Sequence, residues 1–101
     1  MIIYNGGFQQ TQLNRLEVIY IFTKLVHISS FEDAKRFVNL TTKYDDVSMR
    51  LRIDNYEIDA HSIVGVLSIV DDDTNAVFTA NLPDNDKTLL SEIEPFLARS
   101  N

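Results

Sequence analysis

One serine at the start of a short apolar segment is the residue best placed to do chemistry in this sequence. Residues 59–69 read DAHSIVGVLSI, and Ser62 precedes a turn of apolar side chains around Gly65. A serine at a helix N-terminus caps unpaired backbone N–H groups, and a phosphate attached there would meet these groups and the positive end of the helix dipole. Ser62 is therefore a candidate for regulatory phosphorylation. The alternative is that it is a helix cap only.

The residues beside Ser62 form a candidate partner-binding surface. In a short helix Ile63, Val64 and Leu67 cannot all face a sheet, so one or two of them are expected to stay exposed for docking of a protein. The alternative is that all three belong to the core. His61 borders the same segment, and we include it in the predicted partner-binding surface.

The other residues able to do chemistry give weaker signals. The two histidines, His27 and His61, lie far apart, and residues 71–73 lack the alternating ligands, the glycine and the distal glutamate of a calcium loop. The sequence has no cysteine, which excludes disulfides, thiolate metal sites and a cysteine nucleophile. We therefore expect no catalytic residue, no metal site and no cofactor, and a protein that is not an enzyme.

Composition narrows the class of partner. The 101 residues carry a formal net charge of -6 and are 45% hydrophobic, as expected for one globular domain. An acidic surface argues against nucleic acid, whose phosphates are bound by Lys and Arg. No run approaches the roughly 20 apolar residues of a membrane span, and the N-terminus lacks the features of a signal peptide. We expect no membrane insertion and a cytoplasmic location.

The N-terminal half predicts a strand followed by a helix. Residues 16–23 are β-branched and aromatic with apolar side chains on both faces, which favours a strand in the centre of a sheet. Apolar residues recur every three or four positions over about 30–43, which predicts a helix. Ser30 and Asp33 have the spacing of a capping box at its start.

The C-terminal half predicts a hairpin, a short helix, a strand and a final helix. Strict alternation over 47–54 and the apolar positions of 56–60 indicate two strands, joined by a turn in which Asn55 would adopt the left-handed conformation. A short helix is expected over 62–69 and a strand over 76–80. The last helix is expected over about 84–98, kinked or frayed near Glu94 because Pro95 removes a backbone donor.

These elements define a fold class and a core. The order βαββαβα predicts an α+β fold, a mainly antiparallel four-stranded sheet with helices on one face. Residues 1–15 are expected to form an N-terminal extension and residues 16–101 the domain. The apolar faces that this architecture stacks are expected to share one core, comprising Phe37, Val38, Met49, Leu51, Ile53, Leu90, Ile93 and Leu97.

The segment DAHSIVGVLSI, the preceding TKYDD at 42–46 and the order of elements resemble the HPr phosphocarrier proteins. The resemblance covers roughly residues 16–98 and implies the HPr-like open-faced β-sandwich. It also implies that Ser62 corresponds to the serine that a dedicated bacterial kinase phosphorylates in many HPr proteins, with His61 where a lysine is common. The helix after it is, in that family, the docking surface for phosphotransferase-system enzymes and a transcriptional regulator.

The sequence departs from HPr proteins at their phosphate-carrying site. That family carries phosphate on a histidine in a Gly-x-His-Ala-Arg-Pro-like motif at the start of its first helix, and this sequence contains no such motif. Counting back from 42–45, the acceptor position falls near Ser30, its arginine near Glu32 and its proline near Asp33. Ser30 is therefore a degenerate phospho-acceptor position, where the two carboxylates would repel a phosphoryl group.

These observations predict a regulatory protein-binding module of the phosphotransferase-system family, controlled or recognised at Ser62. Its expected partners are a serine kinase, phosphotransferase-system proteins or a transcriptional regulator. One alternative is a sugar phosphotransferase phosphocarrier that uses His27. Another is an unrelated α+β adaptor that shares only the architecture.

Overall fold

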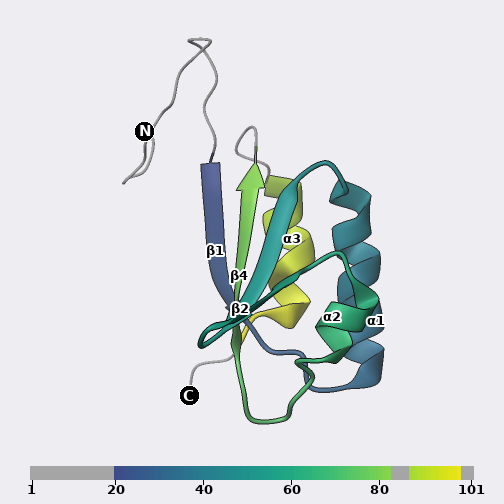
Figure 1. Ribbon diagram of the computed structural model, residues 1–101. Helices are drawn as coiled ribbons and strands as arrows, with labels where there is room; N and C mark the ends of the chain where they lie inside the picture. Colours follow the sequence, from purple (N-terminus) through teal and green to yellow (C-terminus); the bar gives the residue numbers. More distant parts are fainter. Residues whose placement is uncertain (1–19, 83–86, 99–101) are drawn as a thin grey trace.

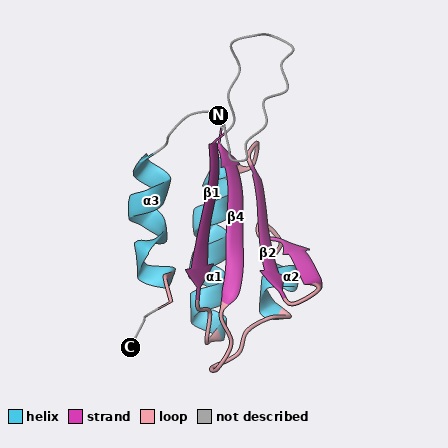
Figure 2. Cartoon of the chain, turned by 90° about the vertical axis from the view of Figure 1, so that its left-hand side faces the viewer, coloured by secondary structure: helices cyan, strands magenta, loops and turns pink. Residues whose placement is uncertain are grey.

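The computed structural model describes residues 20–82 and 87–98, in which four antiparallel strands form one sheet. Three α-helices cover one face of this sheet and leave the other open (Figures 1 and 2). The strands are β1 (Tyr20–Val26), β2 (Ser48–Ile53), β3 (Tyr56–Asp59) and β4 (Ala76–Leu82). The helices are α1 (Phe31–Thr41), α2 (Ile63–Leu67) and α3 (Lys87–Ile93), with 3-10 turns at Thr42–Tyr44 and Glu94–Phe96.

The predicted α+β open-faced sandwich and its element order βαββαβα are confirmed. The predicted extension at 1–15, the start of the first strand at 16–19 and the start of the last helix at 84–86 lie outside the described residues. None of the helices in the described residues has the length and apolar character of a membrane span.

The predicted central position of the first strand is wrong. The sheet order is β1-β4-β2-β3, so β4 lies between β1 and β2 and leaves β1 at an edge. Two of the apolar residues that suggested burial on both faces are exposed: 46% of Tyr20 and 61% of Ile21 are open to solvent. Only Val26, where β1 meets the C-terminal segment at Leu97, is fully buried.

The hairpin of β2 and β3 follows its sequence pattern closely. Met49 and Leu51 are buried while the alternating residues between them face solvent, as expected for a strand with one wet face. The turn differs in one respect, because the left-handed residue is Asp54, with φ 54°, and not Asn55. Aspartate is among the few side chains that tolerate this conformation.

The α1 helix begins as its sequence predicts. The Ser30 Oγ accepts a hydrogen bond of 3.0 Å from the Asp33 backbone N–H, which is one half of a capping box. Its apolar face buries Ala34, Phe37 and Leu40 against the sheet. The α-helix ends at Thr41 and tightens into a 3-10 turn.

Pro95 ends the last α-helix where expected. The chain changes from α3 to a 3-10 turn at Glu94, because proline offers no backbone donor to continue the helix. The core prediction needs one correction here. Leu90 is 44% exposed, and its neighbour Leu89 is the leucine of α3 that is fully buried.

The core lies between the helices and the sheet. Phe37 contacts Phe78 and Phe96 edge to face, with ring centroids 5.6 and 5.3 Å apart. Apart from Leu90, the residues expected in the core are there. Four are buried and three are partly buried against them: Phe37, Met49, Leu51 and Ile93, then Val38, Ile53 and Leu97.

Candidate functional site

Ser62 is the N-cap of α2, as its sequence position predicts. Its Oγ accepts a hydrogen bond of 3.1 Å from the Gly65 N–H, and its main-chain carbonyl accepts one of 2.9 Å from Val66. The Ser62 N–H in turn donates to the carbonyl of Asp59 at 3.1 Å. The serine is only half-buried, so the hydroxyl group that caps the helix also lies at the surface.

The side chains that follow Ser62 divide between core and solvent. Val66 is fully buried, and Leu67 is partly buried against the core. Val64 is 75% exposed and Ile63 is 38% exposed. Since an α-helix of five residues has one inward face, the expectation that one or two apolar residues stay exposed is confirmed, and their role in docking stays a prediction.

Close packing holds α2 against β3. A methyl group added at Gly65 would lie 3.3 Å from the Ile58 Cβ, so a side chain there would require a shift of a few tenths of an ångström between the helix and the strand. The buried Thr41 hydroxyl donates 2.8 Å to the carbonyl of Ala60, which ties α1 to the turn before Ser62. These contacts place the candidate site against β3 and α1.

His61 is held by two hydrogen-bond acceptors. Its Nδ1 lies 2.8 Å from Asp59 Oδ1, and its Nε2 lies 3.1 Å from the carbonyl oxygen of Tyr44. Only 19% of the side chain is exposed. His61 thus links the α1 end to the turn before Ser62, and its predicted contact with a partner stays a prediction.

The Asp59 carboxylate is stabilised in its ionised form. The backbone N–H of His61 donates to it at 2.9 Å, and the imidazole forms the second contact. These two hydrogen bonds lower the pKa of Asp59 below its ordinary value, with smaller contributions from the charges of His61 and Arg50. Sequence reasoning missed this role of Asp59, although its place two residues before His61 is typical of an Asx turn.

Ser30, the degenerate phospho-acceptor position, also caps a helix. Its Oγ is engaged by the Asp33 N–H, and the Asp33 carboxylate accepts from Ser29 at 3.3 Å and from Arg36 at 2.7 Å. Glu32 lies in the same first turn and is exposed. The start of α1 therefore combines a capping serine with two carboxylates.

His27 lies before α1 and faces the β4 side of the molecule. Its Nδ1 is 3.2 Å from the Thr74 carbonyl oxygen and 3.1 Å from Asn75 Oδ1, and its backbone N–H donates 2.8 Å to Phe96. Both side-chain partners come from the loop before β4. The N-cap position of α1 belongs to Ser30, three residues further along the chain.

A polar network that sequence reasoning missed joins the end of α1 to α3. Glu92 accepts a hydrogen bond of 2.6 Å from the Tyr44 hydroxyl and forms an ion pair with Lys43. The hydrogen bonds from Lys43 and Tyr44 lower the pKa of Glu92 below its ordinary value. Tyr44 and Lys43 lie 48 and 49 positions before Glu92 in the sequence, so no local spacing could have indicated these contacts.

Comparison with known proteins identifies the fold. No family model matches the sequence, and no curated protein sequence matches it. Among solved structures, the chain is similar to the phosphocarrier protein HPr from Bacillus anthracis, with a TM-score of 0.58 and 16% identity over 77% of this chain and 98% of that one. It is also similar to HPr-C-His from Thermoanaerobacter tengcongensis, with a TM-score of 0.56 and 19% identity over 75% and 88% of the two chains.

The chain therefore has an HPr-like fold. At identities of 16% and 19% the likeness extends to the architecture and no further. Function has to be argued from the site, because one fold supports many activities.

Proposed function

We propose that this protein is a cytoplasmic, HPr-like regulatory module that binds other proteins and is controlled or recognised at Ser62. The observation that carries the proposal is the combination at α2. A half-buried serine caps the helix, and Ile63 and Val64 beside it are exposed. A phosphate on Ser62 would add about -1.5 to -2 charges next to this apolar surface. Modification would thereby change which proteins can dock there.

The start of α1 supports a role other than phosphate carriage. A carrier needs a nucleophilic group and nearby donors that stabilise the phosphoryl group. Here Ser30 is occupied as a cap, the Asp33 carboxylate is engaged by Ser29 and Arg36, and Glu32 adds an exposed negative charge in the first turn. His27, the alternative carrier, has its Nδ1 directed at Thr74 and Asn75 in a different loop.

Two phosphorylation assays on the full chain test the proposal. With phosphoenolpyruvate and the general phosphotransferase enzyme, we expect no acid-labile label, and label on His27 would favour the carrier function instead. With ATP and a serine kinase that acts on HPr proteins, we expect acid-stable label on Ser62. Ser62→Ala should abolish this label. Ser68→Ala, which removes the other serine beside α2, should retain it.

If the kinase labels neither the wild type nor the variants, Ser62 is not its target. Recognition of the unmodified α2 surface is then tested by a binding experiment. Immobilised wild-type protein should retain phosphotransferase-system proteins or a transcriptional regulator from the native host. Val64→Asp, which places a charge in the exposed apolar surface, should reduce that retention without unfolding the protein, since Val64 is 75% exposed. Equal retention by both would contradict a docking role for α2.

A further inference from the structure

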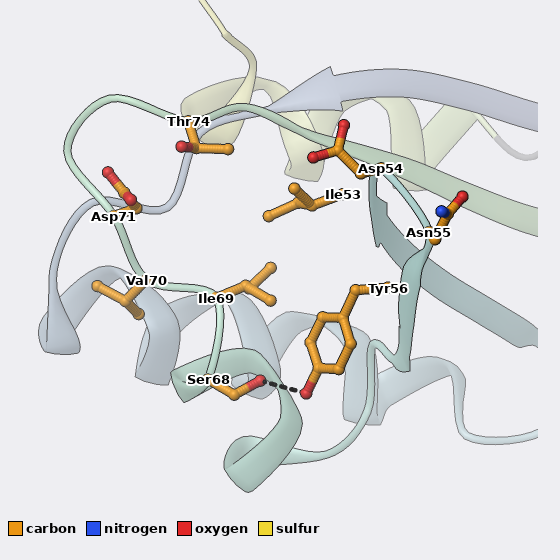
Figure 3. A pocket seen from close by; sticks show the side chains of 9 residues that line it. All are labelled: Ile53, Asp54, Asn55, Tyr56, Ser68, Ile69, Val70, Asp71 and Thr74. Carbon is orange, nitrogen blue, oxygen red and sulfur yellow. Dashed lines mark hydrogen bonds between the residues drawn. The ribbon is translucent and has the colours of Figure 1, made fainter.

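A pocket at the C-terminal end of α2, opposite Ser62, is a second candidate binding site. It lies between the β2-β3 turn and the segment that leads from α2 toward β4 (Figure 3). The pocket is open to solvent and has a volume of about 530 Å³. Its lining combines apolar side chains with two carboxylates, and comprises Ile53, Asp54, Asn55, Tyr56, Ser68, Ile69, Val70, Asp71 and Thr74.

The apolar side chains of the pocket pack on the core of the protein. Ile69 is buried, and Ile53 and Val70 are partly buried against the core. The Ser68 hydroxyl donates its single proton to the Gly65 carbonyl at 2.6 Å, so the Tyr56 hydroxyl, 3.1 Å away, donates to the Ser68 oxygen. This bond holds the half-exposed Tyr56 ring as one wall of the pocket (Figure 3).

Two carboxylates lie on opposite sides of the pocket, Asp54 in the β2-β3 turn and Asp71 after α2 (Figure 3). Asp71 accepts a hydrogen bond of 2.7 Å from the Asp73 N–H, and Arg52 donates to the main-chain carbonyl of Asp54 at 3.3 Å. In the part of the chain that the structure describes, neither carboxylate forms an ion pair. Both therefore keep acceptor oxygens for a cation from outside.

We propose that this pocket binds an arginine side chain of a partner protein. The aliphatic stem of arginine would pack against Ile53 and Ile69, as long charged side chains do on apolar surface. Its planar guanidinium can lie against the ring of Tyr56 and donate to carboxylates on either side. The net charge of -6 attracts such a basic segment. The proposal does not depend on phosphorylation of Ser62, which lies at the other end of α2.

The probe for this site is the blocked tripeptide acetyl-Leu-Arg-Leu-amide, titrated into the full chain labelled with nitrogen-15. We expect saturable shifts of the backbone amides of Ile53, Tyr56 and Ile69. The tripeptide with citrulline in place of arginine has nearly the same shape without the charge, and it should bind at least about twofold more weakly. Equal affinity for the two peptides, or no saturable shift at these residues, would overturn the proposal.

Variants of the carboxylates separate the pocket from the general negative charge. Asp71→Asn keeps an oxygen for the Asp73 N–H, and Asp54→Asn keeps a side chain that tolerates positive φ. Each should weaken the arginine peptide by roughly two- to fivefold, the range of an exposed ion pair. Asp72→Asn removes the same charge next to Asp71 but outside the lining, and should weaken it less. An equal loss in Asp72→Asn would mean that the peptide senses only the overall charge.

Two further outcomes bear on the occupant. Concentration-dependent shifts at Ile53 and Ile69 without peptide, together with a dimer in sedimentation, would identify a second copy of the chain as the occupant and overturn the proposal. Ser62→Ala should leave binding of the arginine peptide unchanged. The proposal for the pocket can therefore be disproved without affecting the proposal for Ser62. The proposal for Ser62 can likewise be disproved without affecting the pocket.

Discussion

Ser62 and Ser30 make the same hydrogen bond at the starts of two helices, yet their surroundings differ. Each hydroxyl accepts from the backbone N–H three residues further on, at 3.1 and 3.0 Å. Asp33 and Glu32 follow Ser30, whereas the exposed apolar residues Ile63 and Val64 follow Ser62. A cap alone therefore does not distinguish the two serines, but their neighbours do.

Substitutions at Ser62 separate its capping role from a regulatory one. Ser62→Ala should lower the free energy of unfolding by about 0.5–2 kcal/mol, because the Gly65 N–H loses its acceptor. Ser62→Asp retains a capping oxygen and adds a charge that the helix dipole favours, so it should be at least as stable as wild type. Urea denaturation measures both effects, and Ser30→Ala is the matched control for loss of a cap.

The functional part of this prediction concerns affinity. Once a partner has been identified, Ser62→Asp should change its affinity several-fold, because a charge beside Ile63 and Val64 alters the electrostatics of docking. Ser30→Asp adds the same charge at the other capped helix and should have a smaller effect. Unchanged affinity in Ser62→Asp, with no kinase labelling, would reduce Ser62 to a helix cap.

Thr41 shows what sequence reasoning could not find at the scale of a residue. Caps such as Ser30 and Ser62 are predictable because donor and acceptor lie three residues apart. The fully buried Thr41 hydroxyl contacts Ala60, which is 19 positions away, and His61 reaches Tyr44 over 17 positions. Contacts of this range depend on how elements pack, and no local pattern records them.

Replacement of Thr41 should therefore be costly for its size. Thr41→Val keeps the shape but leaves the buried carbonyl of Ala60 without this donor, and should cost about 1–3 kcal/mol in free energy of unfolding. The matched control is Thr42→Val, since the Thr42 hydroxyl makes an exposed bond to Asn39. Chemical denaturation should show the smaller loss in the control. Equal losses would mean that the bond to Ala60 adds no stability.

At the scale of elements, the patterns predicted type and order better than position in the sheet. Residues 48–53 alternate because one face of β2 packs on the helices, and the sequence records that alternation directly. β1 has apolar residues on both faces, and yet it is an edge strand of the described sheet, in which β4 is the strand that pairs with it. Pairing between strands whose partner residues are 50 to 62 positions apart leaves no signal in either segment alone.

Core substitutions test how the elements pack. Leu51→Ala on β2 and Ile93→Ala on α3 should each lower the free energy of unfolding by about 2–5 kcal/mol, because both side chains are fully or almost fully buried. Leu90→Ala removes the same kind of side chain from α3 at a position that is 44% exposed, and should cost far less. A loss below about 1 kcal/mol for Leu51→Ala or Ile93→Ala would remove that residue from the core.

At the scale of the whole molecule, two carboxylates support contacts between segments that are distant in sequence. Glu92 connects α3 to Lys43 and Tyr44 after α1. Asp59 holds the nearby His61, whose Nε2 lies 3.1 Å from the carbonyl oxygen of Tyr44. Both carboxyls have a folded-state pKa below the ordinary value, chiefly through these hydrogen bonds. Their contribution to stability is therefore complete above the unfolded-state pKa and is lost as the pH falls through the folded-state pKa.

Stability should thus decrease as the pH drops below about 4, where carboxyl groups take up protons. Glu92→Gln should be less stable than wild type at pH 7, and the difference should shrink by pH 3, because protonation of Glu92 in the wild type removes the same interactions. Urea unfolding between pH 7 and pH 3 measures the free energy of unfolding of the wild type and of Glu92→Gln. Glu94→Gln removes an exposed carboxyl from the neighbouring turn and controls for the change in net charge. If the two variants respond to pH alike, net charge and not the contacts of Glu92 with Lys43 and Tyr44 governs the response to acid.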